Sequence, residues 1–264
     1  MAFARVNHID LYYESHGFGD PVLLIPGLGS DAGTWLPFVE AFPQYKTIIL
    51  ENRGSGRSTR QITNITTEQM AEDAVALLDQ LGVERAHVIG KSMGGMVAQI
   101  VAAKYPHKVR SLVLASSLMR HDAYGDELLD LGRSMAEKSG LFAAYRLAFV
   151  MSYSREYCMH HRERLLEAEA LIKRMEERLL LAGYLAQSLA CQHHDSRSLA
   201  SKIQAPALVI VGNDDVITPA QASRDLATAI KRAELQILPR GGHGFWREYP
   251  DEVNAIVADF LHRH

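Results

Sequence analysis

Short apolar runs recur along the chain, and each ends at a glycine, a proline or a polar residue. Their residues are mainly Val, Ile and Leu, without the alternation of apolar and polar positions that marks a half-exposed strand. A strand that is apolar on both faces is typical of a parallel sheet covered by helices on both sides. The strands predicted in this way are residues 22–25, 47–50, 86–89, 111–114, 207–211 and 235–238.

The segments between these runs have the period of amphipathic helices. Between residues 66 and 81, Met70, Ala74 and Leu77 fall on one stripe, and Gly82 follows as a stop signal. Strands that alternate with such helices predict an α/β fold with a mainly parallel sheet. The same pattern predicts further helices at residues 93–105 and 251–261.

Two segments depart from this alternation. Residues 9–15 alternate apolar and polar positions, which predicts an antiparallel edge strand. Residues 118–202 contain no convincing strand, and Leu, Met, Ala, Glu and Arg dominate them, above all at 165–190. This stretch is too long for one crossover, so we expect a helical cap over the carboxyl ends of the strands, where open α/β sheets bind ligands. The predicted division is a core domain of 1–117 and 203–264 with a cap subdomain of 118–202.

Composition narrows the function classes. The chain has 264 residues, of which 47% are hydrophobic and 22% charged, and its formal net charge is −3. Such a chain fits one domain with an insertion, and no basic surplus points to nucleic acid or to an anionic membrane. No apolar run is long enough for a membrane helix or a signal peptide, which favours a cytoplasmic protein, monomeric or homodimeric, with a small-molecule partner.

A candidate nucleophile lies where a predicted strand becomes a predicted helix. Residues 90–95 read Gly-Lys-Ser-Met-Gly-Gly. A reactive serine at such a junction needs a sharp turn with small neighbours, because the strand and helix backbones crowd there. We therefore interpret Ser92 as the nucleophile. The alternative is a Gly/Ser turn that only caps a helix.

A serine hydroxyl becomes a good nucleophile when a base takes its proton and a third group orients that base. Two aspartates, Asp214 and Asp215, follow the predicted strand that ends near Gly212. His243 follows the strand that ends at Leu238. The chain order Ser, Asp, His is the order found in α/β hydrolases.

These motifs resemble the α/β-hydrolase superfamily over nearly the whole chain. They are Gly-Lys-Ser-Met-Gly at 90–94, Gly-Asn-Asp-Asp-Val-Ile-Thr-Pro at 212–219 and Gly-Gly-His at 241–243. The resemblance implies a mostly parallel eight-stranded sheet flanked by helices and a triad completed by Asp215. The family's acid loop usually reads Gly-x-x-Asp-x-x-x-Pro, which selects Asp215, although an offset of one residue would select Asp214.

The resemblance also implies two backbone donors for an oxyanion. One is the amide after the nucleophile, here that of Met93, and the other is the Leu28 amide in the glycine-rich loop at residues 26–30. Relatives often have histidine where Pro26 stands, which leaves open how this loop is held. The alternative is a glycine-rich loop that only turns the chain.

Residues 51–58 resemble the family segment Asp-x-Arg-Gly-x-Gly-x-Ser, with Glu51 in place of the aspartate. We expect a structural role for this segment, in which Arg53 braces neighbouring loops, and no part in catalysis.

Several large side chains are candidate contacts for an apolar substrate, although each can equally belong to an ordinary core. They are Trp35, Met119, Phe142, Tyr145, Phe149 and Trp246. Adjacent histidines at 160–161 and 193–194 lack further ligands at metal-binding spacing, and no nucleotide-binding glycine motif follows a strand. We therefore expect neither a metal nor an organic cofactor.

The sequence thus predicts a serine hydrolase that cleaves a small apolar ester or lactone through an acyl-enzyme on Ser92. The run Gly-Leu-Gly-Ser-Asp at 27–31 and Trp35 are similar to enol-lactone hydrolases, so a lactonase of aromatic catabolism is one of the candidates. Two alternatives remain open. One is a carbon–carbon bond hydrolase of ring-cleavage products, and the other is a ligand receptor without turnover on the same fold.

Overall fold

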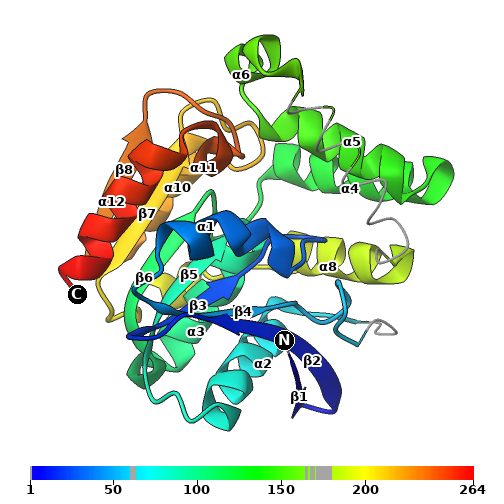
Figure 1. Cartoon of the computed structure of the whole chain (residues 1–264). Coiled ribbons are helices and arrows are strands. Elements are labelled where there is room, and N and C mark those ends of the chain that lie inside the picture. The colour runs from blue at the N-terminus through cyan, green and yellow to red at the C-terminus, as the bar shows by residue number, and fades with distance from the viewer. Residues whose placement is uncertain (1, 60–63, 164–165, 167–169, 171–179) are drawn as a thin grey trace.

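One eight-stranded sheet forms the centre of the computed structural model, which describes residues 2–59, 64–163, 166, 170 and 180–264 (Figure 1). Its strands are β1 Ala2–Val6, β2 Ile9–His16, β3 Pro21–Ile25, β4 Lys46–Leu50, β5 Ala86–Lys91, β6 Val109–Ala115, β7 Ala207–Gly212 and β8 Ala233–Leu238. Their order is β1-β2-β4-β3-β5-β6-β7-β8, and the strands from β4 to β8 in this order run parallel. Each predicted apolar run lies within one strand, and the predicted fold class is confirmed.

The antiparallel end of the sheet differs from the prediction in one respect. Strand β2 is antiparallel as expected, but it is not the edge, because β1 pairs with its outer side. Asn7 and His8 join the two strands with φ of 44° and 66°, the left-handed geometry of a tight hairpin. The buried positions of β1 are Ala4 and Val6, while Phe3 is 58% exposed. The edge strand therefore has too weak an apolar pattern to be recognised.

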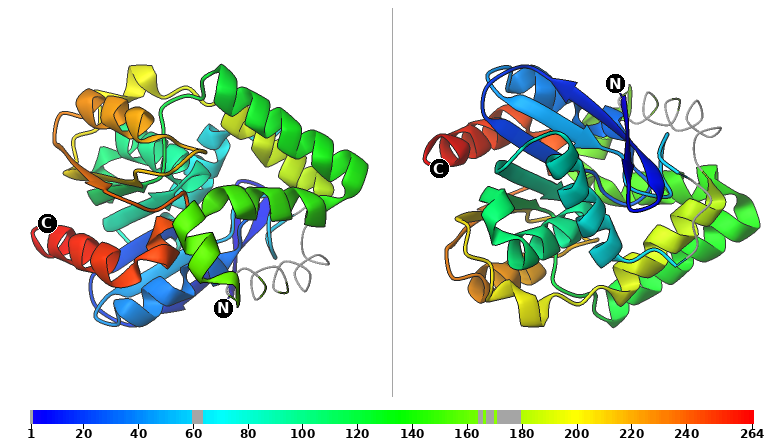
Figure 2. Two further views of the ribbon diagram at one scale, coloured as in Figure 1. Left: turned by 90° about the horizontal axis from the view of Figure 1, so that it is seen from above. Right: turned by 90° about the horizontal axis from the view of Figure 1, so that it is seen from below.

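Helices cover both faces of the sheet (Figure 2). The helices of the described residues are α1 Leu36–Ala41, α2 Thr67–Gln80, α3 Met93–Lys104, α4 Ala123–Ser139, α5 Leu141–Ser152, α6 Arg155–His160, α8 Leu181–His193, α9 Arg197–Ala200, α10 Ala220–Ala229, α11 Phe245–Glu248 and α12 Pro250–His262, with short 3₁₀ turns η1 Ala32–Trp35 and η2 Pro106–Lys108. Leu77 of α2 and Ile100 of α3 pack in the apolar core on one face. Phe38 of α1 and Val257 of α12 pack in the core on the other.

The strand order reverses at β3, which lies between β4 and β5. The chain passes from β3 to β4 through α1 on one face, and from β4 to β5 through α2 on the other. The loops that follow β3 and β5 therefore diverge at the carboxyl ends of the strands. Such a reversal point leaves a crevice where open α/β sheets bind ligands.

Residues 118–202, named here the cap segment, contain helices and no strand among the residues that the structure describes. Helices α4, α5, α6 and α8 lie together at one end of the molecule (Figures 1 and 2). Much of the predicted helix-forming stretch at 165–190 lies outside the described residues, and α8 covers its last part. The subdomain boundaries at 118 and 202 stay a prediction.

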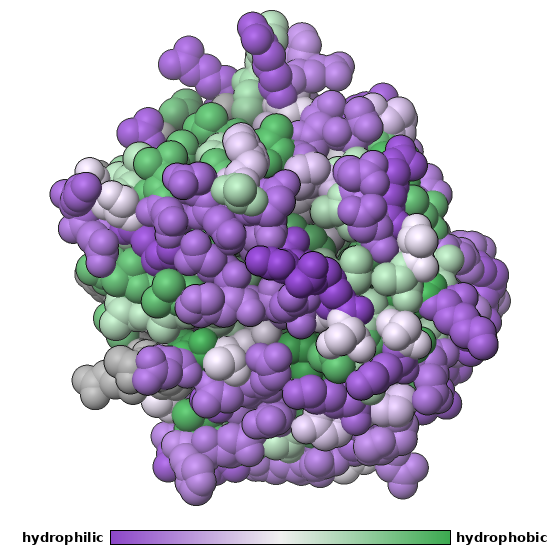
Figure 3. Space-filling model, turned by 180° about the vertical axis from the view of Figure 1, so that it is seen from behind, coloured by the Kyte–Doolittle hydropathy of each residue, from purple (hydrophilic) through white to green (hydrophobic). Residues whose placement is uncertain are grey.

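The face seen from behind in Figure 3 is covered mainly by hydrophilic side chains, with apolar residues showing between them. Within the described ranges, no helix combines the length and the apolar character that crossing a membrane would require.

Candidate active site

Ser92 lies at the apex of the turn between β5 and α3. Its φ of 55° and ψ of −122° form a strained conformation that residues other than glycine rarely adopt. Two hydrogen bonds hold the turn. The Ser92 amide donates to the Ala115 carbonyl at 2.9 Å, and the Ser117 hydroxyl donates to the Ser92 carbonyl at 3.0 Å. The strain is therefore fixed by the neighbouring strand β6, and Ser92 lines the large cavity described below.

The glycines around Ser92 have a steric cause. A Cβ atom on Gly90 would lie 2.2 Å from the Gly94 carbonyl oxygen, and one on Gly94 would lie 2.0 Å from that of Ile25. A Cβ atom on Gly95 would lie 2.5 Å from the Cβ of Ser117. Real Cβ atoms do not approach other heavy atoms this closely, so glycine is the residue that fits at all three positions.

His243 and Asp215 form a buried pair. The distance from His243 Nδ1 to Asp215 Oδ2 is 2.9 Å, and the residues are 7% and 4% exposed. The amides of Ile217 and Thr218 donate to Asp215 Oδ1 at 2.9 and 2.8 Å. Burial opposes ionisation of Asp215, but the charge and hydrogen bond of His243 hold the pKa of this carboxyl below its ordinary value. A carboxylate beside Nδ1 favours the tautomer in which Nε2 is free to accept a proton.

The adjacent Asp214 has different contacts. It is exposed, its Oδ2 accepts a hydrogen bond from the Gly241 amide at 3.2 Å, and its own amide donates to the Gly241 carbonyl at 2.9 Å. Of the two candidate acids, Asp215 is the one that contacts the imidazole of His243. Asp214 instead braces the loop at Gly241, two residues before His243.

Ser92 and His243 line one cavity of about 1250 Å³. This volume exceeds the roughly 300–1,000 Å³ of common small-molecule sites. The cavity lies between the loops after β3, β5 and β8 and the cap helices α4 and α5. Four of the predicted substrate contacts line it, namely Trp35, Tyr145, Phe149 and Trp246.

Met119 and Phe142 are not among the described residues that line this cavity, which corrects their prediction as pocket residues. Met119 packs against the apolar core of the sheet. Phe142 faces the Arg146 guanidinium one turn later on α5, with 6.0 Å between the charge centre and the ring. Phe142 lies in the first turn of α5, before Ala144, which is the first residue of this helix that lines the cavity.

The sequence reasoning also missed His121, which lines the cavity from the beginning of the cap segment. Its Nδ1 is buried and has no hydrogen-bond partner among the described residues, and burial lowers the pKa of its imidazole. No motif surrounds this residue, so only the placement of the cap segment reveals it.

The two predicted oxyanion donors lie beside the nucleophile. Met93 is the first residue of α3, where an amide has no acceptor within the helix. The loop at 26–30 runs past Ser92, since a Cβ atom on Gly27 would lie 3.3 Å from that of Ser92. Neither the Met93 nor the Leu28 amide donates to another described residue. Both amides are thus available to a bound oxygen atom, and their role stays a prediction.

Two side chains from the segment at 51–58 hold the ends of the loop at 26–30. Asn52 Nδ2 donates to the Pro26 carbonyl at 3.0 Å, and the Ser55 hydroxyl donates to the Ser30 carbonyl at 2.8 Å. This is the bracing that the sequence suggested, but it comes from other residues than Arg53.

Arg53 instead forms a two-bond ion pair with Asp73 of α2, at 2.6 and 2.7 Å. Glu51, which replaces the family's aspartate, accepts hydrogen bonds from the Ala32 and Arg57 amides at 3.1 and 2.6 Å. Both residues are structural, as expected.

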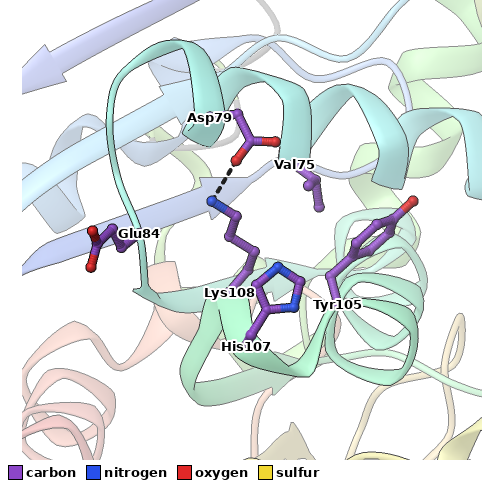
Figure 4. Close-up of a pocket in the computed structure, with 6 residues that line it drawn as sticks. All are labelled: Val75, Asp79, Glu84, Tyr105, His107 and Lys108. Carbon is purple, nitrogen blue, oxygen red and sulfur yellow. Dashed lines mark ion pairs between the residues drawn. The ribbon is translucent and has the colours of Figure 1, made fainter.

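A second, shallow hollow lies away from the cavity, beside α2 and η2, where Lys108 forms an ion pair with Asp79 (Figure 4). Among the described residues that line it there is no serine, threonine or cysteine. In the described part of the chain, no group of three or more His, Cys, Asp or Glu side chains is placed to hold a metal ion.

Comparison with known proteins places this geometry in a family. The model of the family described as "alpha/beta hydrolase fold" matches residues 20–246. The chain belongs to the α/β-hydrolase fold family. Within this family, Ser92 occupies the strand-to-helix turn and His243 the loop after the last strand, as its members' motifs require.

Named relatives of this α/β hydrolase include hydrolases of different substrates. It is 31% identical to "Putative carbamate hydrolase RutD" of Azorhizobium caulinodans, over 98% of each chain. The enol-lactonase of Burkholderia xenovorans is 28% identical with a TM-score of 0.88, over 98% of this chain and 99% of the other. A thermophilic esterase of Thermogutta terrifontis is 25% identical with a TM-score of 0.85, over 99% and 98%. These similarities support a hydrolase and leave its substrate open.

Proposed function

We propose that this protein hydrolyses a carboxylic ester or lactone through an acyl-enzyme on Ser92. The observation that carries the proposal is that Ser92 and His243 line one cavity while Asp215 holds Nδ1 of the same imidazole. This leaves Nε2 as the nitrogen that faces the reaction, as nucleophilic catalysis by serine needs.

In the proposed reaction the Ser92 oxygen attacks the carbonyl carbon as His243 Nε2 takes the hydroxyl proton. The negative charge moves to the carbonyl oxygen, where the Leu28 and Met93 amides stabilise it. A single donor of this kind is worth about 10²–10³ in kcat. The imidazolium then gives its proton to the leaving alcohol, and the carbon–oxygen bond of the ester breaks. Water, activated by His243, releases the acid from Ser92 by the same steps.

The cap segment supplies selectivity in this proposal. In it the cap segment is a subdomain over the sheet, and the support is that Tyr145 and Phe149 of α5 line the same cavity as Trp35 and Trp246 of the core. These aromatic walls suit a small substrate with an apolar acyl or alcohol group.

A carbamate is the second candidate, because curated relatives that match nearly the whole chain are named for carbamate hydrolysis. A carbamate offers a carbonyl to the same nucleophile and the same two amides. Its acyl-enzyme, a carbamoyl ester of Ser92, loses the carbamoyl group more slowly, because the nitrogen donates electrons to the carbonyl carbon.

The test compares release of p-nitrophenol from acyl esters of graded length and from the matched N-alkyl carbamates, with hydrolysis of simple lactones followed by pH-stat. Wild type, Ser92→Ala and the exposed-serine control Ser201→Ala are assayed together. We expect ester or lactone turnover that only Ser92→Ala abolishes. Turnover of carbamates alone would favour the second candidate, and folded wild-type protein inactive on every substrate would refute both.

A further inference from the structure

Both backbone polar groups of Gly29 are bound by side chains of the cap segment. The Tyr145 hydroxyl of α5 donates to the Gly29 carbonyl at 2.7 Å. The Gly29 amide donates to Gln187 Oε1 of α8 at 2.9 Å. Gly29 follows Leu28 directly and has a φ of 63°, a left-handed conformation. The middle of the loop at 26–30, named here the oxyanion loop, is therefore bound by side chains of the cap segment.

Gln187 is fixed in this position. It is completely buried, and its Nε2 donates to the Arg53 carbonyl at 2.8 Å. Since a carboxamide has one oxygen and one nitrogen, the second bond sets which end faces Gly29. Close packing holds the helix itself, because a Cβ atom on Gly183 of α8 would lie 1.9 Å from the Gly54 carbonyl oxygen. Gln187 does not line the cavity, so it acts on Gly29 and not on substrate.

The Tyr145 hydroxyl is protonated and held in place by its neighbours. Burial raises the pKa of its hydroxyl above its ordinary value, so the hydroxyl keeps its proton at neutral pH. Its ring packs beside that of Tyr184 from α8, with centroids 5.7 Å apart. The hydroxyl that binds Gly29 is thus set by the packing of two cap helices against each other.

These contacts complete the support of the oxyanion loop. Asn52 and Ser55 bind Pro26 and Ser30, at the two ends of the loop, and the Ser30 amide donates to the Gly27 carbonyl within it at 3.1 Å. The cap segment supplies the side chains that bind Gly29, between these points. The Gln187 bond holds the peptide between Leu28 and Gly29, and the Tyr145 bond holds the next peptide, between Gly29 and Ser30. Together they limit rotation of the backbone that follows Leu28. A proline at position 26 also has no amide hydrogen with which to brace the loop from within.

We propose that Tyr145 and Gln187 are positioning residues that hold the Leu28 amide toward the oxyanion, so that the cap segment takes part in transition-state stabilisation. The inference rests on the proposed function. It assigns to cap residues an effect on the rate of acyl transfer that is separate from selection of substrate.

The test measures how fast a small alkyl fluorophosphonate phosphonylates Ser92, followed by intact mass, together with kcat and KM for the best p-nitrophenyl ester. The phosphonyl oxygen occupies the oxyanion position, and this probe needs no knowledge of the physiological substrate. The variants are Tyr145→Phe, Gln187→Met and Gln187→Glu, and the last of these keeps an acceptor for the Gly29 amide. Ser92→Ala is the negative control, and Tyr105→Phe, beside the shallow hollow, is the matched tyrosine control.

We expect Tyr145→Phe and Gln187→Met to slow phosphonylation and to lower kcat about 10-fold each, less than the loss of a direct donor. Gln187→Glu should recover most of the rate, and KM should change less than kcat. A purely structural role would instead lower thermal stability and leave the labelling rate of the folded protein unchanged.

Labelling of Tyr145→Phe and Gln187→Met at the wild-type rate would overturn the inference and leave the proposed function intact. Wild-type protein that is folded and not labelled at Ser92 would overturn both. Tyr145→Phe removes one oxygen atom and keeps the hydrogen bond of the Gly29 amide to Gln187. Its labelling rate therefore tests the inference even if Gln187→Met fails to fold.

Discussion

His243 Nδ1 lies 2.9 Å from Asp215 Oδ2, whereas the neighbouring Asp214 carboxylate binds the Gly241 amide instead. Two consecutive aspartates therefore have separate contacts, one with the imidazole and one with the backbone of the loop that carries it. Because the contacts are separate, two matched substitutions can test which aspartate is the acid of the proposed triad.

Asp215→Asn should lower kcat by about 10³–10⁴, because an amide in place of the carboxylate favours the wrong imidazole tautomer and no longer stabilises the imidazolium. Asp214→Asn, which keeps an acceptor for Gly241, should change kcat by less than about threefold. Steady-state kinetics on one p-nitrophenyl ester check both values. The assignment of Asp215 would be refuted if the two variants had equal activity.

The turn at Ser92 should not tolerate a methyl group. Gly94→Ala places a Cβ atom against the Ile25 carbonyl, and the atoms it meets are backbone atoms that cannot move aside as a flexible side chain can. We expect the free energy of unfolding to fall by at least about 4 kcal/mol, or no soluble protein. Gly82→Ala is the control, since its Cβ atom meets nothing within 4 Å and only the φ of 65° opposes it. That strain costs about 1–2 kcal/mol. Urea unfolding compares the two, and similar losses would contradict the steric argument.

The Arg53–Asp73 ion pair should be costly to break, because its members are only 7% and 1% exposed. Asp73→Ala leaves a buried guanidinium without its partner, which should lower the free energy of unfolding by about 3–5 kcal/mol. Asp10→Ala, which breaks the exposed pair with Arg5, should cost less than about 1 kcal/mol. The double variant Arg53→Met, Asp73→Leu should recover much of the loss. Equal costs for the two single variants would refute this prediction.

Stability should fall in mild acid. Burial chiefly lowers the pKa of His87 and of His194 from 6.5 to about 4. Between these values the unfolded chain binds protons that the native state does not, so the free energy of unfolding is highest above pH 6.5 and decreases as the pH falls toward 4. Urea unfolding at pH 7.5, 6 and 5 measures the slope. His87→Asn should give a shallower slope than wild type, while the exposed His8→Asn should keep it; identical slopes in both variants would contradict the prediction.

The parts of the site that a short stretch of sequence determines could be predicted. The turn around Ser92 depends on local crowding, so its glycines are visible in the motif itself. The closeness of Asp215 and His243 follows because both loops leave neighbouring parallel strands, β7 and β8, at the same edge of the sheet. The central strands were equally clear, since their buried faces demand continuous apolar residues.

The parts that depend on helix packing far along the chain could not be predicted. The composition of the cap segment predicts helices, but not which part of α5 lines the cavity, so Phe142 was predicted as a pocket residue and Tyr145 was not recognised as a loop anchor. The contact of Gln187 with Gly29 joins residues 158 positions apart. Nothing in the surrounding sequence distinguishes this glutamine from one on a solvated helix.

The bonds from Tyr145 and Gln187 to Gly29 also restrict how this chain can be recombined with its relatives. An insertion between two strands looks like an exchangeable module, whose replacement would alter substrate range and leave the chemistry of the core intact. Here a transplanted insertion that lacked a hydroxyl and a carboxamide at these two points would leave the Gly29 amide and carbonyl buried and unsatisfied. Chimeras should therefore lose reaction rate before they gain a new specificity, unless both side chains are inherited together with the donor helices.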